Sequence, residues 1–192
     1  VLKIKILPSD EQRLLLLQTI EEANKACAYI SDVAWENKTF GQYKIHHLCY
    51  DDVRQKFNLS AQMVVRCISK VADAYKLDKK KKREFRTYGS ISYDARILSY
   101  KGEEASVWTV SGRQKIPFVC HDKAYIPYFK GEADLVFKKG KFFLYQTIDI
   151  PEAEINVPND IVGLDFGIAD IVCTSEGKTY SSDTLNKYRE KR

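Results

Sequence analysis

One carboxylate inside an apolar, β-rich segment points most directly to chemistry in this chain. Asp165 lies in the middle of residues 162–168 (VGLDFGI), and a second apolar run at residues 171–174 leads into a turn at residues 175–178. Such runs predict the first strands of a sheet, with Asp165 projecting into a site. Metal ions that hydrolyse phosphodiesters are held by several acidic groups from distant parts of a fold. Asp165 is therefore a candidate ligand of such a site, and the site would need further acidic residues.

The cysteines and histidines suggest little other metal chemistry. The five cysteines are widely scattered and include no Cys-x-x-Cys pair, which argues against a disulfide framework and against a compact zinc site. His46, His47 and Cys49 form one cluster, and Cys120 with His121 forms the other, but neither has zinc-finger spacing. We expect buried thiols, surface imidazoles and no zinc site in this segment.

Basic residues gather in two places. The chain has 31 Lys and Arg against 26 Asp and Glu, a net charge of +5. Residues 78–86 hold six basic and two acidic residues, and residues 138–141 form a second cluster. A local focus of positive charge fits phosphate contacts with a nucleic acid, although a solvated linker would look similar. The candidate contacts are Lys79, Lys80, Lys81, Lys82, Arg83, Arg86 and, after a turn glycine, Arg113.

The segment before this run is helical. Residues 1–7 alternate like a strand, and Ser9 with Gln12 has the spacing of a capping box. Apolar residues then recur every three or four positions. We expect helices at residues 9–37, at about 46–57 and, capped by Ser60, at 60–76.

The third helix has two separable faces. Its apolar stripe consists of Val64, Ile68, Val71 and Tyr75. Gln62, Arg66 and Lys70 are spaced by four on another face, which is either simply solvated or laid against DNA. In DNA recognition, Gln can read adenine, Arg can read guanine, and Lys contacts phosphate. These three residues are therefore candidate DNA contacts.

After residue 86 the period changes from helical to alternating. Strands are expected at residues 90–97, 106–110, 115–120, 133–137 and 142–148, separated by turns at 101–102, 111–112 and 139–140. Tyr88 and Tyr93 could stack on bases if they are exposed, although aromatic residues in alternating strands more often belong to the core. The economical arrangement is an α+β fold, a small barrel with three helices inserted after its first strand. The polar, proline-punctuated residues 151–160 then form a linker to the Asp165 segment.

The sequence contains no apolar run of about 20 residues, so we expect no transmembrane helix. Its first residues lack the long apolar core of a secretory signal. An intracellular, cytoplasmic protein is therefore expected.

Five short motifs, in this order, resemble the N-terminal part of the TnpB family. These proteins are transposon-encoded, RNA-guided DNA endonucleases, also called OrfB-type transposases, and are related to type V CRISPR effectors. The matching stretches are residues 92–96 (SYDAR), 112–117 (GRQKIP), 131–136 (GEADLV), 140–144 (GKFFL) and 162–168 (VGLDFGI). Each motif is short, and their order and spacing make the resemblance specific.

The resemblance implies a wedge-type, OB-like β-barrel interrupted by a helical recognition domain and followed by the start of a RuvC/RNase H-like nuclease domain. The implied boundaries are residues 1–8 for the first barrel strand, 9–85 for the inserted helices, 86–155 for the remaining barrel and 156–192 for the incomplete nuclease domain. Guide RNA and double-stranded DNA would be the partners, in a prokaryotic, nucleoid-associated protein. Asp165 would be a catalytic residue and a Mg²⁺ ligand.

The family's later catalytic acids and its four-cysteine zinc element would lie beyond Arg192. We therefore expect that this chain alone does not cleave DNA, whether it is a fragment or a shortened natural product. One alternative is a nuclease-dead module that binds RNA or DNA. A second is the nucleotide-binding hairpin of the sugar-kinase and actin ATPases, which favours hydroxyl residues where this chain has Ile168 and Ala169.

Overall fold

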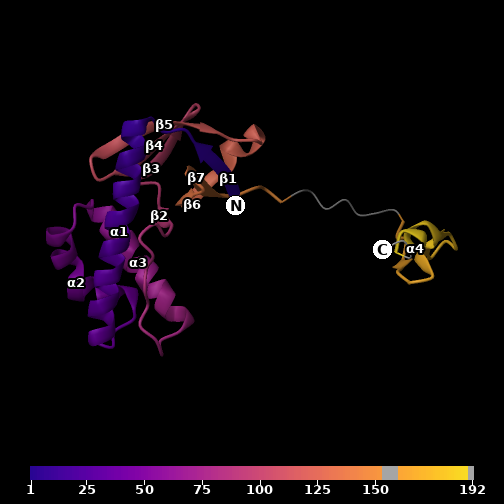
Figure 1. Ribbon diagram of the computed structural model, residues 1–192, viewed down its shortest axis with the longest axis horizontal. Coiled ribbons are helices and arrows are strands. Elements are labelled where there is room, and N and C mark those ends of the chain that lie inside the picture. Colours follow the sequence, from indigo (N-terminus) through magenta and orange to yellow (C-terminus); the bar gives the residue numbers. More distant parts are fainter. Residues whose placement is uncertain (153–159, 190–192) are drawn as a thin grey trace. The chain divides into compact units, whose positions relative to one another are not determined.

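The chain divides into two compact units, Val1–Ile150 and Pro151–Arg192. The structure is a computed structural model and describes residues 1–152 and 160–189 (Figure 1). Most of the predicted linker at residues 151–160, and the predicted border between residues 155 and 156, lie outside the described residues. The two units are therefore described separately.

The first unit opens with one strand and three helices, as the sequence predicts. These are β1 (Leu2–Ile6), α1 (Asp10–Glu36), α2 (Gln42–Lys56) and α3 (Ala61–Leu77). Ser9 Oγ accepts from the backbone N–H of Gln12 at 3.3 Å, and Gln12 Oε1 accepts from the Ser9 N–H at 3.1 Å. This confirms the capping box. The second helix begins four residues earlier than predicted because its N-cap is Gly41, which has no side chain to mark the start.

Seven antiparallel strands form a nearly closed, barrel-like sheet beside the helices (Figure 1). Their order is β2-β6-β7-β1-β5-β4-β3. The strands after β1 are β2 (Ile91–Tyr93), β3 (Leu98–Lys101), β4 (Glu104–Thr109), β5 (Gly112–Val119), β6 (Phe129–Lys138) and β7 (Lys141–Ile148), and a short 3-10 helix, η1 (Lys123–Tyr128), precedes β6. The first strand lies between β5 and β7, so the barrel needs both ends of the unit's sequence. A fold with barrel strands and three inserted helices is confirmed.

The single strand predicted at residues 90–97 is wrong. β2 ends at Tyr93, and Asp94 starts a turn in which its backbone carbonyl accepts from the N–H groups of Ile97 and Leu98 at 3.0 and 2.9 Å. Its Oδ1 also accepts from the Arg96 N–H at 3.0 Å. An aspartate that bonds its own backbone two residues on favours a turn over a strand. The chain then leaves in a new direction as β3.

One continuous core joins the helices to the barrel. The apolar stripe of α3 is buried as predicted, and Ile4 and Ile6 of β1 point into the same core. Tyr93 is fully buried, and its hydroxyl donates to the Trp108 carbonyl at 2.8 Å. This bond joins edge strand β2 to β4, two strands that have no ladder between them among the described pairings.

The second unit contains a three-stranded antiparallel sheet and a short helix. Its elements are β8 (Leu164–Asp165), β9 (Asp170–Thr174), β10 (Thr179–Ser181) and α4 (Asp183–Arg189), with strand order β10-β9-β8. The predicted turn at residues 175–178 is confirmed, with Gly177 at φ +81°. The strand that carries Asp165 is shorter than predicted. A Cβ on Gly167 would lie 3.0 Å from the Asp170 carbonyl oxygen, so the chain turns tightly just after this strand.

Candidate nucleic-acid interface

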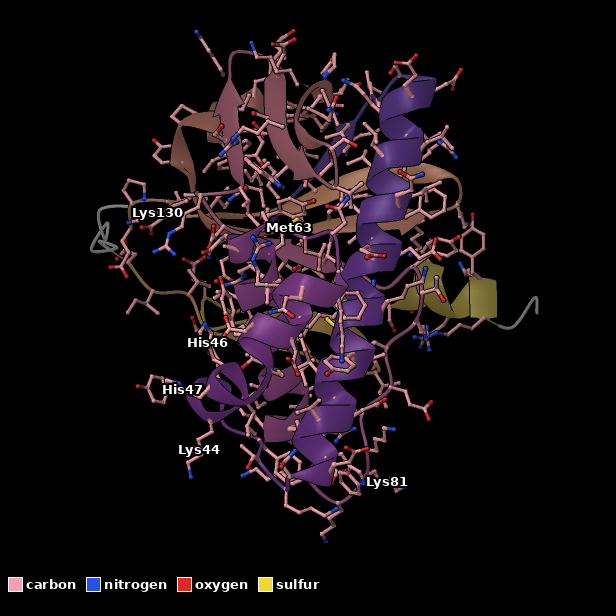
Figure 2. All side chains as sticks on the ribbon, turned by 90° about the vertical axis from the view of Figure 1, so that its left-hand side faces the viewer. Lys44, His46, His47, Met63, Lys81 and Lys130 are labelled. Atoms are coloured by element: carbon pink, nitrogen blue, oxygen red, sulfur yellow. The ribbon has the colours of Figure 1, made fainter. Side chains whose placement is uncertain are left out.

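The basic loop, residues 78–86, is exposed at its tip and anchored at its end. Lys79, Lys80 and Lys81 are exposed, and none of them forms an ion pair with any residue that the structure describes. Figure 2 shows Lys81 at the end of the helices farthest from the barrel strands. The next two residues are paired, Lys82 with Asp32 at 2.8 Å and Arg83 with Asp78 at 3.1 Å. The tip therefore offers three cations to solvent.

A buried hydrogen-bond network fixes the end of this loop on the helices. Ser31 Oγ donates to the Arg83 carbonyl at 2.6 Å, and the Tyr75 hydroxyl accepts from the Arg83 N–H at 3.3 Å. Ser31 Oγ and the Tyr75 hydroxyl lie 2.9 Å apart, and Tyr75 is fully buried. The loop is therefore held by main-chain contacts at Arg83, unlike a free linker.

Replacing Tyr75 by Phe should lower the free energy of unfolding by about 1–3 kcal/mol, because the variant leaves the Arg83 N–H without its acceptor and the buried Ser31 hydroxyl without one of its two partners. Urea unfolding at pH 7 measures the loss. Tyr29→Phe is the matched control, since the Tyr29 hydroxyl bonds Lys56 at 2.7 Å in an exposed position and should matter less. Equal losses in the two variants would show that the network does not anchor the loop.

The polar face of α3 lies against the barrel. Gln62 donates to the Asp94 carboxylate and accepts from Arg96 Nη1 at 2.9 Å. Arg66 forms a two-bonded ion pair with Glu132 of β6, with Nη1 at 2.6 Å from Oε1. Only 16% of the Arg66 side chain is exposed, and its Nε has no hydrogen-bond partner within the described residues.

Lys70 completes the same pattern. Its Nζ donates to Asn24 Oδ1 at 2.8 Å and to the Ser90 carbonyl at 2.7 Å. The three residues thus join the helices to the barrel, a role that their spacing does not reveal. Their contact with DNA stays a prediction, and it would require that these internal bonds be exchanged for bonds to DNA.

The remaining candidates differ in their availability. The Arg86 side chain is exposed. Arg113 is exposed, but its Nη2 donates to the Arg96 carbonyl at 2.5 Å and its guanidinium carbon lies 5.6 Å from the Trp108 ring centroid. Tyr88 is 52% exposed, whereas Tyr93 is buried in the barrel and so belongs to the core, as is usual for aromatic residues in alternating strands.

Strand pairing creates a basic surface that the sequence did not show. The lysine–aromatic face consists of the outward side chains Lys3, Lys5, Lys138, Lys141, Phe143 and Tyr145. Lys3 pairs with Tyr145 and Lys5 with Phe143 across β1 and β7, while Lys138 and Lys141 pair at the β6–β7 turn. Lys3 Nζ lies 4.2 Å from the Phe143 ring centroid.

This lysine–aromatic face is accessible and rich in positive charge. Lys3, Lys138 and Lys141 are exposed, and Lys5, Phe143 and Tyr145 are partly exposed. Within residues 1–152 and 160–189 none of its lysines forms an ion pair, and Asp134, opposite Tyr145, is the acid that borders it in the ladder. The alternation of residues 1–7 places Lys3 and Lys5 on one side of a strand, which was the available signal.

Asp165 is exposed on β8, opposite Cys173 of β9. It lines a shallow depression of about 310 Å³ together with Cys173, Thr174 and Ser175. In the described parts of the chain, no three His, Cys, Asp or Glu side chains come together as a metal site would need. Among these residues Asp165 is thus a single candidate ligand, and they do not by themselves make a two-metal site.

The expectation of buried thiols is confirmed for four of the five cysteines, since Cys173 is only partly buried. Burial raises the pKa of the Cys49 thiol to about 11, so this group stays protonated at neutral pH. His47 is exposed, and His46 stacks on Tyr50 at a centroid distance of 4.5 Å. Figure 2 shows both imidazoles on α2.

Comparison with protein families and with curated proteins finds no match to this chain. Among the described helices, none has the length and apolar character needed to cross a membrane.

Proposed function

We propose that this chain is the N-terminal, nucleic-acid-binding part of a TnpB-like RNA-guided DNA endonuclease, which binds a guide RNA and a short DNA motif beside the transposon. The observation that carries the nucleic-acid part is the lysine–aromatic face. Four lysines from three strands surround two aromatic rings, although the first two lysines and the last two are more than 130 residues apart in sequence. Lysines contact phosphates, and exposed aromatic rings stack on bases.

The basic loop lies toward the other end of α1 from this face. Arg13 in the first part of α1 donates to the Gly140 carbonyl at the β6–β7 turn at 2.8 Å, and Asp32 near the end of the same helix holds Lys82. At 1.5 Å per residue, the 19 residues from Arg13 to Asp32 span about 28 Å. A duplex that contacts both the lysine–aromatic face and the basic loop would therefore extend over about eight base-pair steps of about 3.4 Å each.

The family assignment adds the catalytic part of the proposal. The support for it is the order of the five motifs, together with a barrel whose helices follow its first strand. On this proposal Asp165 would be one of several acidic residues that hold Mg²⁺ in the complete protein, and the metal would supply the Lewis-acid chemistry for phosphodiester cleavage.

A second candidate is a nuclease-dead module that binds RNA or DNA. The observation in its favour is that no group of three His, Cys, Asp or Glu side chains able to hold a metal includes Asp165 among the described residues. The nucleotide-binding hairpin is a weaker alternative, because Ile168 and Ala169 offer no hydroxyl groups to phosphate.

Salt dependence of binding tests the proposed function. In a Lys3→Gln, Lys5→Gln, Lys141→Gln variant the affinity should fall less steeply with salt. The negative slope of log affinity against log salt should shrink in magnitude by about 2 or more, since each lost phosphate contact removes about 0.7 for single strands and about 0.9 for duplexes. The matched control, Lys25→Gln, Lys44→Gln, Lys76→Gln, removes the same charge from helix surfaces. Fluorescence anisotropy with a labelled RNA and a labelled duplex gives both slopes.

The proposal fails if wild-type protein binds neither probe, or if both triple variants change the slope equally. Neutralising Lys79, Lys80 and Lys81 in the same assay asks whether the basic loop takes part. An unchanged slope in that variant would limit the interface to the barrel.

A further inference from the structure

The barrel has an open seam between β3 and the first half of β6. β2 and β3 are the two ends of the strand order, and β2 pairs with β6 along residues 133–135. Among the described strands, β3 pairs with β4 alone, and residues 129–132 of β6 pair with no strand on the side away from β7. The two strand edges therefore face each other without a ladder.

Side chains close the inner side of this seam. The Tyr100 hydroxyl of β3 donates to Gln146 Oε1 of β7 at 2.7 Å. Gln146 Nε2 in turn donates to the carbonyls of Lys130 at 3.1 Å and Thr147 at 2.8 Å. Gln146 is only 3% exposed, and its amide provides a hydrogen-bond donor to the Lys130 carbonyl, in the part of β6 where the register with β7 shifts after Phe129.

Outside these bonds lies a cavity of about 340 Å³, which we call the seam pocket. The Phe129 and Tyr100 rings form its apolar wall, with centroids 4.8 Å apart. Asp94, Ser99 and Lys130 add polar groups around it. Lys130 is exposed, paired with Asp149 at 2.6 Å, and lies at the edge of the barrel part in Figure 2. The pocket thus suits a flat ligand with apolar faces, polar edges and an anionic group outside.

An added peptide strand is a poor occupant. β3 has only four residues, and β6 is interrupted at this level by a register shift with Gly131 at φ +73°. Short edges and bulges oppose strand addition. The Lys130 carbonyl is also already engaged by Gln146. A nucleobase needs only one slot of this size, and its ring can stack while its edge bonds to polar groups.

We propose that the seam pocket holds one unpaired nucleobase of the bound nucleic acid. This proposal rests on the proposed function, and it assigns a base-binding role to residues of the barrel seam, notably Phe129, Tyr100 and Ser99. The base lies against the Phe129 ring, and the attached phosphate lies towards Lys130.

Ligand-observed NMR with the four nucleoside 5′-monophosphates tests the pocket, and ribose 5-phosphate is the matched ligand without a base. With wild-type protein, saturation should be transferred from the protein to the base protons of the nucleotides. Ribose 5-phosphate should show no saturation transfer. Ser99→Trp fills the pocket from an exposed strand position and should weaken nucleotide binding by about tenfold or more. Ser111→Trp, in the exposed β4–β5 turn, is the control and should bind as wild type does.

The proposal is overturned if no nucleotide binds wild-type protein, if ribose 5-phosphate binds equally well, or if both tryptophan variants behave alike. Oligonucleotide affinity measured on the same samples separates this failure from failure of the proposed function. If oligonucleotides bind with a steep salt dependence while Ser99→Trp changes nothing, the pocket is wrong and the function stands. If oligonucleotides do not bind, the proposed function is wrong whatever the nucleotides do.

Discussion

Between pH 10 and pH 12 the free energy of unfolding should fall by about 1.4 kcal/mol per pH unit for each of two barrel tyrosines, Tyr93 and Tyr100. Burial raises the pKa of both phenols in the folded protein, because an anion is costly in the apolar interior. An unfolded tyrosine ionises near pH 10. Above that pH the unfolded chain releases two protons that the folded chain retains, so unfolding becomes progressively more favourable.

A single-residue variant tests whether Tyr93 contributes to this pH dependence of stability. Tyr93→Phe removes one titrating group, so above pH 10 its stability should fall less steeply than that of wild type, by about 1.4 kcal/mol per pH unit. At pH 7 the same variant should be less stable, because the Trp108 carbonyl loses its donor at 2.8 Å. Urea unfolding from pH 8 to pH 12 measures both. Tyr43→Phe, at a 77% exposed position, is the control and should keep the wild-type steepness. A Tyr93→Phe slope equal to that of wild type would contradict the account.

Local signals in the sequence predicted most of the elements. The capping box at Ser9 and Gln12 fixed the start of α1, and the alternating runs located most of the barrel strands. The boundary errors have local causes. Asp94 bonds to its own backbone and ends β2 early, and Gly41 gives no side-chain signal for the start of α2.

The site was less predictable because its residues meet through long-range pairing. Nothing in the neighbourhood of Lys5 shows that Phe143 will lie opposite it. Conversely, the spacing of Gln62, Arg66 and Lys70 correctly gave a common face but could not show that Glu132 and Ser90 would lie against it. Periodicity reveals which side chains share a face, and the tertiary fold decides what that face contacts.

Asn24 is the point where α1, α3 and the chain entering the barrel meet. Its side chain is only 2% exposed. Nδ2 donates to the carbonyls of Gly89 at 2.9 Å and Thr87 at 3.3 Å, while Oδ1 accepts from Lys70 Nζ at 2.8 Å. The neighbouring chain is close, since a Cβ on Gly89 would lie 3.2 Å from Asn24 Oδ1. One amide therefore serves partners on both sides of the junction.

Asn24→Ala should lower the free energy of unfolding by about 2–4 kcal/mol, because the part-buried Gly89 carbonyl loses its donor and Lys70 Nζ keeps only the Ser90 carbonyl as a partner. Asn24→Asp keeps the acceptor for Lys70 but loses the donor to Gly89, so its loss should be smaller than that of the alanine variant. Asn37→Ala is the matched control, since Asn37 is exposed and its Nδ2 bonds only the Val33 carbonyl at 2.9 Å among the described contacts. Its stability should change by no more than about 0.5 kcal/mol. Urea unfolding at pH 7 orders the three variants, and equal stability of Asn24→Ala and Asn37→Ala would show that the junction does not depend on this amide.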